Sequence, residues 1–234
     1  MMMASVTDVA GVNSISARIL ANAAAAMAGM IQAPPVDLGE GRPLIAASMF
    51  GVTTPSVTHA RERLEGLGYE VLTFHATGAG GKAMEGLMDA GFLQGVLDIT
   101  TTELCDELVG GVLSAGPDRL EAAGRLGLPQ VVSLGALDMV NFGARAMVPP
   151  QFEDRNLYVH NPSVTLMRTT KDEMVELGRQ IARKLSAATG RTALFAVLRD
   201  EVGGNVELIE MDNNVNDPEF AEAMADKLDE YMKS

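Results

Sequence analysis

The chain has 234 residues, of which 47% are hydrophobic and 21% charged, and it carries a formal net charge of −13 with a pI of about 4.6. This composition is that of a globular protein, and an acidic chain without a basic run is a poor partner for nucleic acid. The single cysteine, Cys105, excludes an intramolecular disulfide and a thiolate metal cage, and it favours a reduced, cytoplasmic location.

The first 32 residues differ in pattern from the rest and are predicted to form a separate docking or dimer segment. Residues 1–9 are apolar, and apolar side chains recur at helical spacing over 13–30. The alanine-rich centre of that helix is expected to be too short and too weakly hydrophobic to span a bilayer, so no membrane is predicted as a partner. A connector rich in proline and glycine follows, and it opens a domain predicted over 33–234.

From residue 44 onward, apolar runs alternate with helical patterns. Strands are predicted at 44–50, 69–74, 95–99, 130–134, 157–159, 192–198 and 206–211. Helices are predicted at 56–67, 83–89, 103–108, 117–126, 172–187 and 218–232. Several strands are uniformly apolar, as strands of a buried parallel sheet are. The alternation predicts a Rossmann-like three-layer α/β/α domain with a mostly parallel sheet and more helix than strand.

Polar residues concentrate in the turns after these strands, where open parallel sheets bind ligands. The first turn contains Gly51, Thr53 and Thr54 ahead of a helix start, whose free N–H groups attract anions. The second turn is rich in glycines that would let a phosphate approach the backbone; its candidate ligand residues are Thr77, Gly78, Gly80 and Gly81. Its spacing matches neither a Walker loop nor a dinucleotide fingerprint, so a flexible turn explains it equally well.

The third predicted strand carries a carboxylate and leads into a polar turn. Asp98 lies inside an apolar run and needs partners or a shifted pKa, so it is either a general base or a buried acceptor for loop N–H groups. The turn residues Thr100, Thr101, Thr102 and Glu103 offer hydroxyls and a carboxylate to a ligand. The same spacing also fits a capping box with Thr100 or Thr101 as the cap.

Two histidines and an arginine complete the predicted site. His75 and His160 each follow a strand, which places an acid–base pair at one sheet edge, and no compact set of further ligands points to a metal. Arg168 is a candidate anion clamp, with a salt bridge to a helix carboxylate as the alternative. The remaining candidate ligand residues lie in the turns near 135 and 160; they are Gly135, Asp138 and Asn161.

Six segments resemble the second domain of an uncharacterised two-domain bacterial family related to the tomato mosaic virus resistance protein. They are GVTTP at 51–55, FHATG at 74–78, LDITTTELCDELVGG at 97–111, SAGPDRL at 114–120, GALDMVNFG at 135–143 and YVHNP at 158–162. The resemblance runs from about residue 1 to 232 and implies Rossmann-like domains that assemble into oligomers.

The same resemblance implies a possible cofactor and a partner. The plant relative binds ATP and blocks viral replication, so ATP is a possible cofactor here. The first domain of the family, with its own glycine-rich loop, is absent and is an expected partner. Relatives also carry a longer insert where residues 199–205 join two predicted strands directly.

Two functions therefore remain open. The first is part of an enzyme that acts on a small anionic or phosphorylated metabolite, with His75 or His160 moving a proton while helix starts and Arg168 hold the anion. The second is a non-catalytic module that binds a nucleotide such as ATP or a protein partner.

The small residues of the helix at 13–30 predict assembly. An alanine-rich helix that follows an apolar arm needs a flat surface to cover it, so a homodimer or a contact with the missing first domain is expected. Sedimentation at micromolar concentration should give about twice the 24.7 kDa of one chain. A clean monomer contradicts the dimer, and a dimer that survives deletion of residues 1–32 places the interface elsewhere.

Overall fold

A computed structural model describes residues 2–8, 10–34, 41–196 and 202–234 and divides the chain into two compact units, Met1–Gly41 and Arg42–Ser234. The first unit contains one helix, α1 (Ser14–Gln32). Asn13 caps this helix, because its Oδ1 accepts the N–H groups of Ile15 and Ser16 while the Ser16 hydroxyl accepts the N–H of Asn13.

No residue of α1 is buried within its own unit. Its 19 residues extend beyond the alanine-rich stretch seen in the sequence, and by length and composition the helix could cross a membrane. Core helices of globular proteins and signal sequences pass the same test. Large apolar side chains are exposed along the helix; they include Ile15, Leu20, Met27, Met30 and Ile31.

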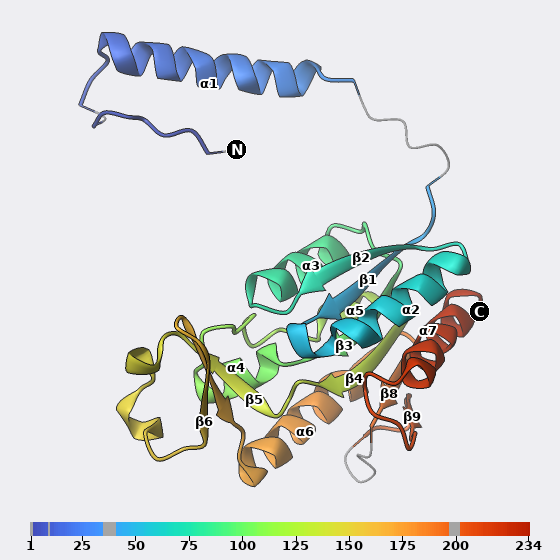
Figure 1. Ribbon diagram of the computed structural model, residues 1–234. Helices are drawn as coiled ribbons and strands as arrows, with labels where there is room; N and C mark the ends of the chain where they lie inside the picture. The colour runs from blue at the N-terminus through green and yellow to red at the C-terminus, as the bar shows by residue number, and fades with distance from the viewer. Residues whose placement is uncertain (1, 9, 35–40, 197–201) are drawn as a thin grey trace. The chain divides into compact units, whose positions relative to one another are not determined.

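The second unit is built on a six-stranded sheet in which every neighbouring pair is parallel (Figure 1). The strand order is β2-β1-β3-β4-β8-β9. The strands are β1 (Leu44–Met49), β2 (Glu70–His75), β3 (Gly95–Thr100), β4 (Gln130–Gly135), β8 (Thr192–Phe195) and β9 (Val206–Ile209). All six residues of β3 are buried, as its largely apolar run predicts for a central strand.

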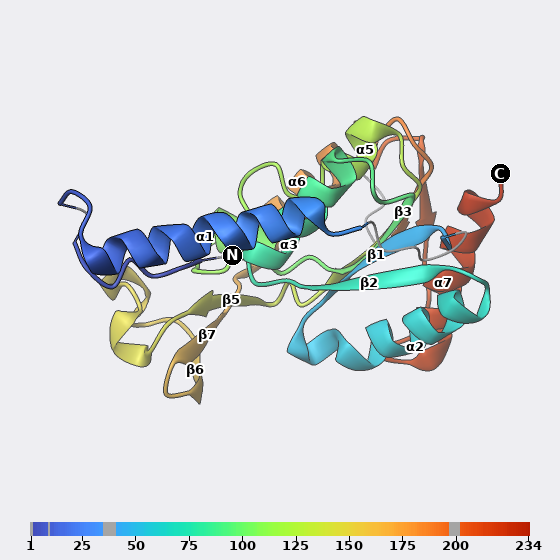
Figure 2. The same cartoon turned by 90° about the horizontal axis from the view of Figure 1, so that it is seen from above.

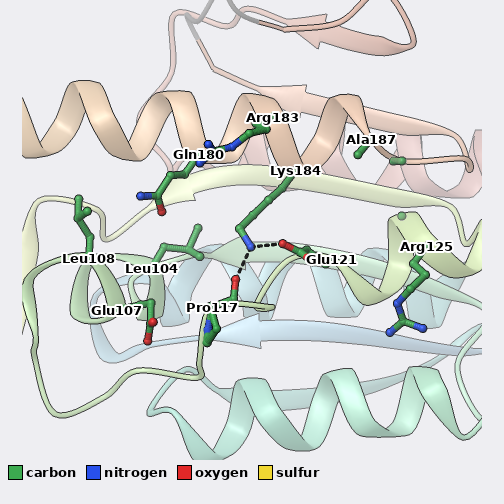
Figure 3. A pocket seen from close by; sticks show the side chains of 12 residues that line it. Leu104, Glu107, Leu108, Pro117, Glu121, Arg125, Gln180, Arg183, Lys184 and Ala187 are labelled. Carbon is green, nitrogen blue, oxygen red and sulfur yellow. Dashed lines mark hydrogen bonds and ion pairs between the residues drawn. The ribbon is translucent and has the colours of Figure 1, made fainter.

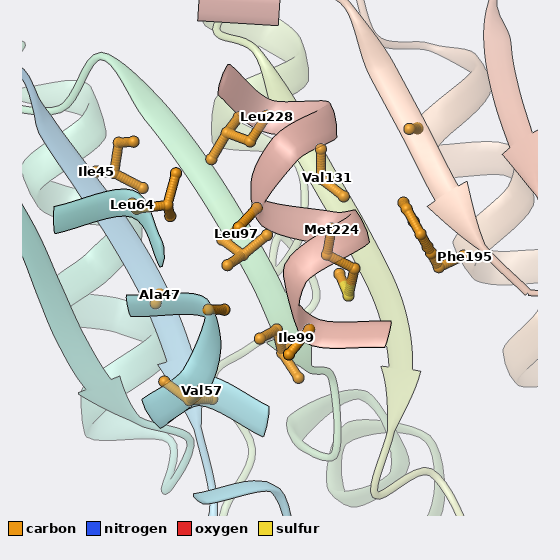
Figure 4. Packing of buried hydrophobic residues seen from close by; sticks show 14 of the residues in the cluster. Ile45, Ala47, Val57, Leu64, Leu97, Ile99, Val131, Phe195, Met224 and Leu228 are labelled. Carbon is orange, nitrogen blue, oxygen red and sulfur yellow. The ribbon is translucent and has the colours of Figure 1, made fainter. Parts of the chain in front are cut away.

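Helices cover both faces of this sheet (Figure 2). On one face lie α2 (Thr54–Gly66) and α7 (Pro218–Met232), and on the other lie α3 (Ala79–Asp89), α4 (Glu103–Val109), α5 (Ala122–Leu126) and α6 (Lys171–Ser186). Under α2 and α7, fully buried side chains interlock between helix and sheet, among them Leu64, Leu97 and Leu228 (Figure 4). The predicted three-layer α/β/α fold with more helix than strand is confirmed.

A second sheet, which the sequence did not predict, is antiparallel with the order β5-β7-β6. Its strands are β5 (Met139–Phe142), β6 (Leu157–Asn161) and β7 (Val164–Arg168), with two short 3-10 helices, Arg145–Met147 and Pro150–Phe152, between the first two. The chain enters β5 directly from β4 through Ala136, whose φ is +59°. The strand predicted at 157–159 therefore belongs to this sheet and not to the parallel one.

Two other elements are shorter than predicted. The helix expected at 117–126 forms only as α5, because Leu120 has a φ of +75°, which an α-helix does not allow. A third 3-10 turn, Gly51–Thr53, precedes α2. The strand expected at 192–198 ends at Phe195, and its last residues, like the start of the connection 199–205, lie outside the described residues.

Asp106 links α4 to the antiparallel sheet. Its Oδ1 accepts the N–H of Leu113 at 3.2 Å and of Asn141 at 3.0 Å, and its Oδ2 accepts the Asn141 side-chain amide at 2.8 Å. Asp106 is fully buried, and this burial raises its pKa from 3.8 to about 6 in spite of the three hydrogen bonds. The buried Oδ1 of Asn141 has no hydrogen-bond partner among the described residues.

We predict that Asp106→Asn becomes more stable relative to the parent chain as the pH rises from about 4 to 6. The folded protein holds a proton on Asp106 that the unfolded chain has already lost above pH 3.8, so the parent loses on the order of 3 kcal/mol of this contribution across that window. An asparagine keeps the acceptor and donates to the Asn141 oxygen after an amide flip. Urea unfolding at several pH values measures the difference, and a pH-independent difference contradicts the prediction.

Candidate functional site

The sheet has a reversal in strand order between β1 and β3, since the chain leaves β1 toward α2 on one face and leaves β3 toward α4 on the other (Figure 2). Such a reversal opens the crevice in which α/β sheets bind ligands. Here a side chain from a third segment occupies it. Arg119, of which 2% is exposed, reaches the carboxyl end of β3 and forms a buried ionic cluster with Asp98, Glu103 and Glu85.

Every nitrogen of the Arg119 guanidinium has a partner. Nη1 and Nη2 donate to the two oxygens of Asp98 at 2.5 and 2.8 Å, and Nε donates to Glu103 at 2.7 Å. Burial alone would lower the pKa of this group, but Asp98 and then Glu103 raise it above the ordinary arginine value. Glu85 lies 3.5 Å from Nη1, and its pKa is raised by burial, against the effect of Arg119. The cluster is thus an arginine cation held by at least two carboxylates.

Glu103 occupies the glycine-rich turn that the sequence proposes as a phosphate cradle. Its Oε1 accepts the N–H of Gly78 at 2.6 Å and of Gly81 at 3.1 Å. A Cβ on Gly81 would lie 2.2 Å from the Glu103 carboxylate, and one on Gly80 would lie 1.8 Å from a backbone carbonyl oxygen. The glycines therefore let the backbone of this turn approach the carboxylate of Glu103, which is part of the protein, and not a bound phosphate.

The capping box predicted between Glu103 and Thr100 or Thr101 is wrong. The Glu103 carboxylate is turned toward the glycine turn and Arg119, and α4 begins after Thr102 without a side-chain cap. The Thr102 hydroxyl is buried and has no hydrogen-bond partner in the described part of the chain.

Asp98 is 1% exposed and is held by Arg119 and by the Ser48 hydroxyl at 2.6 Å. Of the two interpretations that the sequence left open, the buried acceptor fits this placement, although the donors are side chains and not loop N–H groups. A carboxylate so enclosed has no route to a substrate proton.

Hydroxyls at the strand ends also contact the protein itself. Thr53 and Thr100 share a hydrogen bond of 2.7 Å, and Thr101 donates to the Ser133 carbonyl at 3.2 Å. Thr54 and Thr77 are more exposed, and each donates to a nearby backbone carbonyl oxygen.

The two predicted glycines outside the glycine-rich turn differ in environment. Gly51 is exposed, and a Cβ there would meet no atom within 4 Å, whereas a Cβ on Gly135 would lie 2.2 Å from the Ile99 carbonyl oxygen. Gly135 is thus needed for strand packing at the bulge between β3 and β4.

The expectation that His75 and His160 share one sheet edge is wrong. His75 ends β2, is exposed, and lies with its ring centroid 5.5 Å from that of Phe50. His160 is an exposed residue of β6 in the antiparallel sheet, next to the Tyr158 ring. The structure therefore does not bring them together as an acid–base pair.

Arg168 is paired with Asp138 at 3.2 Å, and the two side chains are 63% and 47% exposed. Arg168 thus forms a salt bridge, which is the alternative that the sequence left open, although Asp138 lies in a turn and not on a helix. Asn161 accepts the N–H of Ser163 at 2.8 Å and so stabilises the hairpin between β6 and β7. Arg168 and Asp138 lie at one end of the antiparallel sheet and Asn161 at the hairpin turn at its other end, so the structure does not bring the three together.

A cavity that was not predicted lies between α6 and the segment 117–125 (Figure 3). We call it the α5–α6 groove; its volume is about 590 Å³. It forms because α4 and α5 have only 7 and 5 residues and leave part of the sheet face uncovered. Its apolar lining consists of Leu104, Leu108, Pro117, Gly124, Ala187 and Ala188.

Charged and polar side chains converge on the same groove. Lys184 is 10% exposed, and its Nζ donates to the Pro117 carbonyl and to Glu121, each at 2.5 Å (Figure 3). Arg183 is exposed and has no ion-pair partner among the described residues, whereas Arg125 is paired with Asp89 at 2.7 Å. The other polar lining residues are Glu107 and Gln180. An apolar floor with a few convergent polar groups is the usual form of a small-molecule site.

Two smaller cavities adjoin these features. One of about 450 Å³ lies between α3 and the segment 115–125 and shares Glu121 and Arg125 with the groove. Another, of about 260 Å³, lies at the carboxyl ends of β4 and β8 and has no charged side chain in its lining, which includes Gly135 and Asn213. No group of three or more possible metal ligands occurs within the described residues.

Comparison with known proteins identifies relatives of both parts of the chain. Residues 42–196 and 187–232 match the C-terminal domain of the uncharacterised protein family UPF0261, and residues 1–35 match its N-terminal domain. A UPF0261 protein of Clostridium tetani is 52% identical over 259 residues, and one of Mesorhizobium japonicum is 45% identical over 258 residues. These alignments cover 99% and 97% of this chain but 64% of each relative, so the chain spans less than two thirds of their length.

A plant relative matches a smaller part. The ToMV resistance protein Tm-1(GCR237) of Solanum lycopersicum is 47% identical over 190 residues, which cover 79% of this chain and 25% of the plant protein. The resemblance stated from the sequence motifs is thereby confirmed.

We predict that Arg119→Met lowers the free energy of unfolding by about 3–5 kcal/mol, because it leaves Asp98 and Glu103 buried without a counter-ion. Urea unfolding measures the change. Arg125→Met removes an exposed ion pair nearby and should leave the midpoint almost unaltered. A loss below about 1 kcal/mol for Arg119→Met contradicts the assignment of Arg119 as the centre of the cluster.

Proposed function

The chain belongs to the UPF0261 family, and we propose that it is a ligand-binding α/β domain whose α5–α6 groove takes a small anionic metabolite. One observation carries the proposal: the Lys184 side chain, only 10% exposed, brings an ammonium group into a cavity whose lining is partly apolar. A partly desolvated cation interacts more strongly with an anion than an exposed one does. Arg183 adds a second positive charge at the same rim.

The proposed anion site is the α5–α6 groove and not the glycine-rich turn. At the turn, the two N–H groups that a phosphate would need are taken by Glu103, which is itself fixed by Arg119. In the groove, Arg183 is exposed, and the carboxylate that pairs with Lys184, Glu121, is itself half-exposed. The domain would then be part of a longer cytoplasmic enzyme acting on a small anionic or phosphorylated metabolite, for which the buried, reduced Cys105 is suitable.

A second candidate is a non-catalytic nucleotide-binding or protein-interaction module. It is favoured by the name of the plant relative, a resistance protein, which describes an effect on a virus and not a reaction. The exposed apolar side chains of α1, within the residues that match the family's N-terminal domain, suit a contact with the rest of such a domain or with a second copy of the chain.

We predict that Lys184→Met weakens binding of an anion that occupies the groove by about 1.5–3 kcal/mol, the value of a charge-assisted hydrogen bond. Calorimetric titration of the 234-residue chain with inorganic phosphate, succinate and a non-hydrolysable ATP analogue measures it. The matched control is Lys227→Met, because Lys227 is also largely buried and ion-paired but lies on α7 across the sheet.

The outcomes separate the candidates. Loss of phosphate or succinate binding in Lys184→Met alone supports the metabolite site. Binding of the ATP analogue that neither variant alters supports the module and rejects the groove.

A further inference from the structure

The α5–α6 groove holds an internal carboxylate that can be exchanged for an external one. The Nζ of Lys184 contacts two oxygens, the Pro117 carbonyl and Glu121, and an ammonium group has three donors. The Glu121 side chain is 46% exposed, and Lys184 is its one ion-pair partner within the described residues. Rotation of Glu121 toward water would therefore leave a positive charge at the centre of the groove without burying a negative one.

The side chains around the Lys184 ammonium indicate what else a ligand of the groove must contain besides an acid group. Leu104 and Leu108, one turn apart on α4, line one end of the groove, and Ala187 lines the other (Figure 3). Apolar side chains thus lie on both sides of the nearly buried Lys184 ammonium, alongside the charged and polar residues of the same lining. Its volume of about 590 Å³ lies within the ~300–1,000 Å³ usual for small-molecule sites.

We propose that the groove binds an amphipathic carboxylate, a molecule with one acid group and an apolar chain, whose acid group replaces Glu121 on Lys184. This inference rests on the proposed function and adds the class of ligand. The apolar chain lies along Leu104 and Leu108, and Glu121 turns to solvent when the ligand enters. Glu121 thus acts as the internal competitor of the ligand.

The probe is octanoate. Acetate, which lacks the apolar chain, and 1-octanol, which lacks the charge, are the comparison ligands. Calorimetric titration of the 234-residue chain should show that octanoate binds more tightly than either. Glu121→Gln removes the competing charge and should raise octanoate affinity about fivefold, the value of releasing a half-exposed ion pair. Glu121→Ala should do the same, so that a folding defect in one variant does not decide the result.

Glu107→Gln is the matched control. Glu107 lines the same groove and carries the same charge, but its carboxylate accepts a hydrogen bond from Ser114 and not from Lys184. Octanoate affinity should change less than about twofold in this variant, since only long-range charge is removed. A rise confined to the Glu121 variants supports the exchange.

Four results overturn the inference. Equal gains in the Glu107 and Glu121 variants indicate a general charge effect, and octanol binding as tightly as octanoate indicates no role for Lys184. If phosphate or succinate binds through Lys184 while octanoate does not, the proposed function stands and the amphipathic ligand is rejected. If no anion binds to any variant, both proposals fail.

Discussion

A buried guanidinium must be matched by carboxylates, and this requirement organises the carboxyl end of the parallel sheet. Taking Arg119 out of water costs several kcal/mol, which only close, well-oriented counter-ions offset. Asp98 comes from the centre of the sheet and Glu103 from the start of α4, so one side chain links β3, α4 and the segment before α5. Through Glu103 the same link reaches Gly78 and Gly81 and fixes the start of α3.

The position of Arg119 also determines where open space remains. To bring its guanidinium under the sheet edge, the chain adopts a positive φ at Leu120, whose N–H is accepted by Glu85. That conformation interrupts the helix that the sequence pattern favours at 117–126, and only the last five residues form α5. A full-length helix would cover the sheet beside α6. The α5–α6 groove is thus a consequence of the ionic cluster, although none of its lining residues belongs to that cluster.

The sequence predicts the parallel sheet well and the site poorly, for physical reasons. Apolar runs such as 95–99 and helical patterns such as 172–187 are local signals, and both appear in the structure close to where they are expected. Arg119 is 16 residues from Glu103 and 21 from Asp98, so no periodicity joins them, although these two buried carboxylates require a cation. The antiparallel sheet was missed because β5 and β7 are short and their pairing is fixed only in three dimensions.

Two carboxylates in this domain occupy places that a ligand anion could take, and their burial decides between them. Glu103 is fully buried and accepts three hydrogen bonds, one of them from a guanidinium. Displacing the Glu103 carboxylate would leave a buried charge without its partners, which costs about 3–5 kcal/mol. A phosphate would have to offset that cost in order to bind. Glu121 is half-exposed and is held by one lysine, Lys184, whose own side chain is 10% exposed. Turning Glu121 into water leaves no buried carboxylate behind, so an anion that takes its place on Lys184 displaces less than it would at the glycine-rich turn, where the Glu103 carboxylate is fully buried.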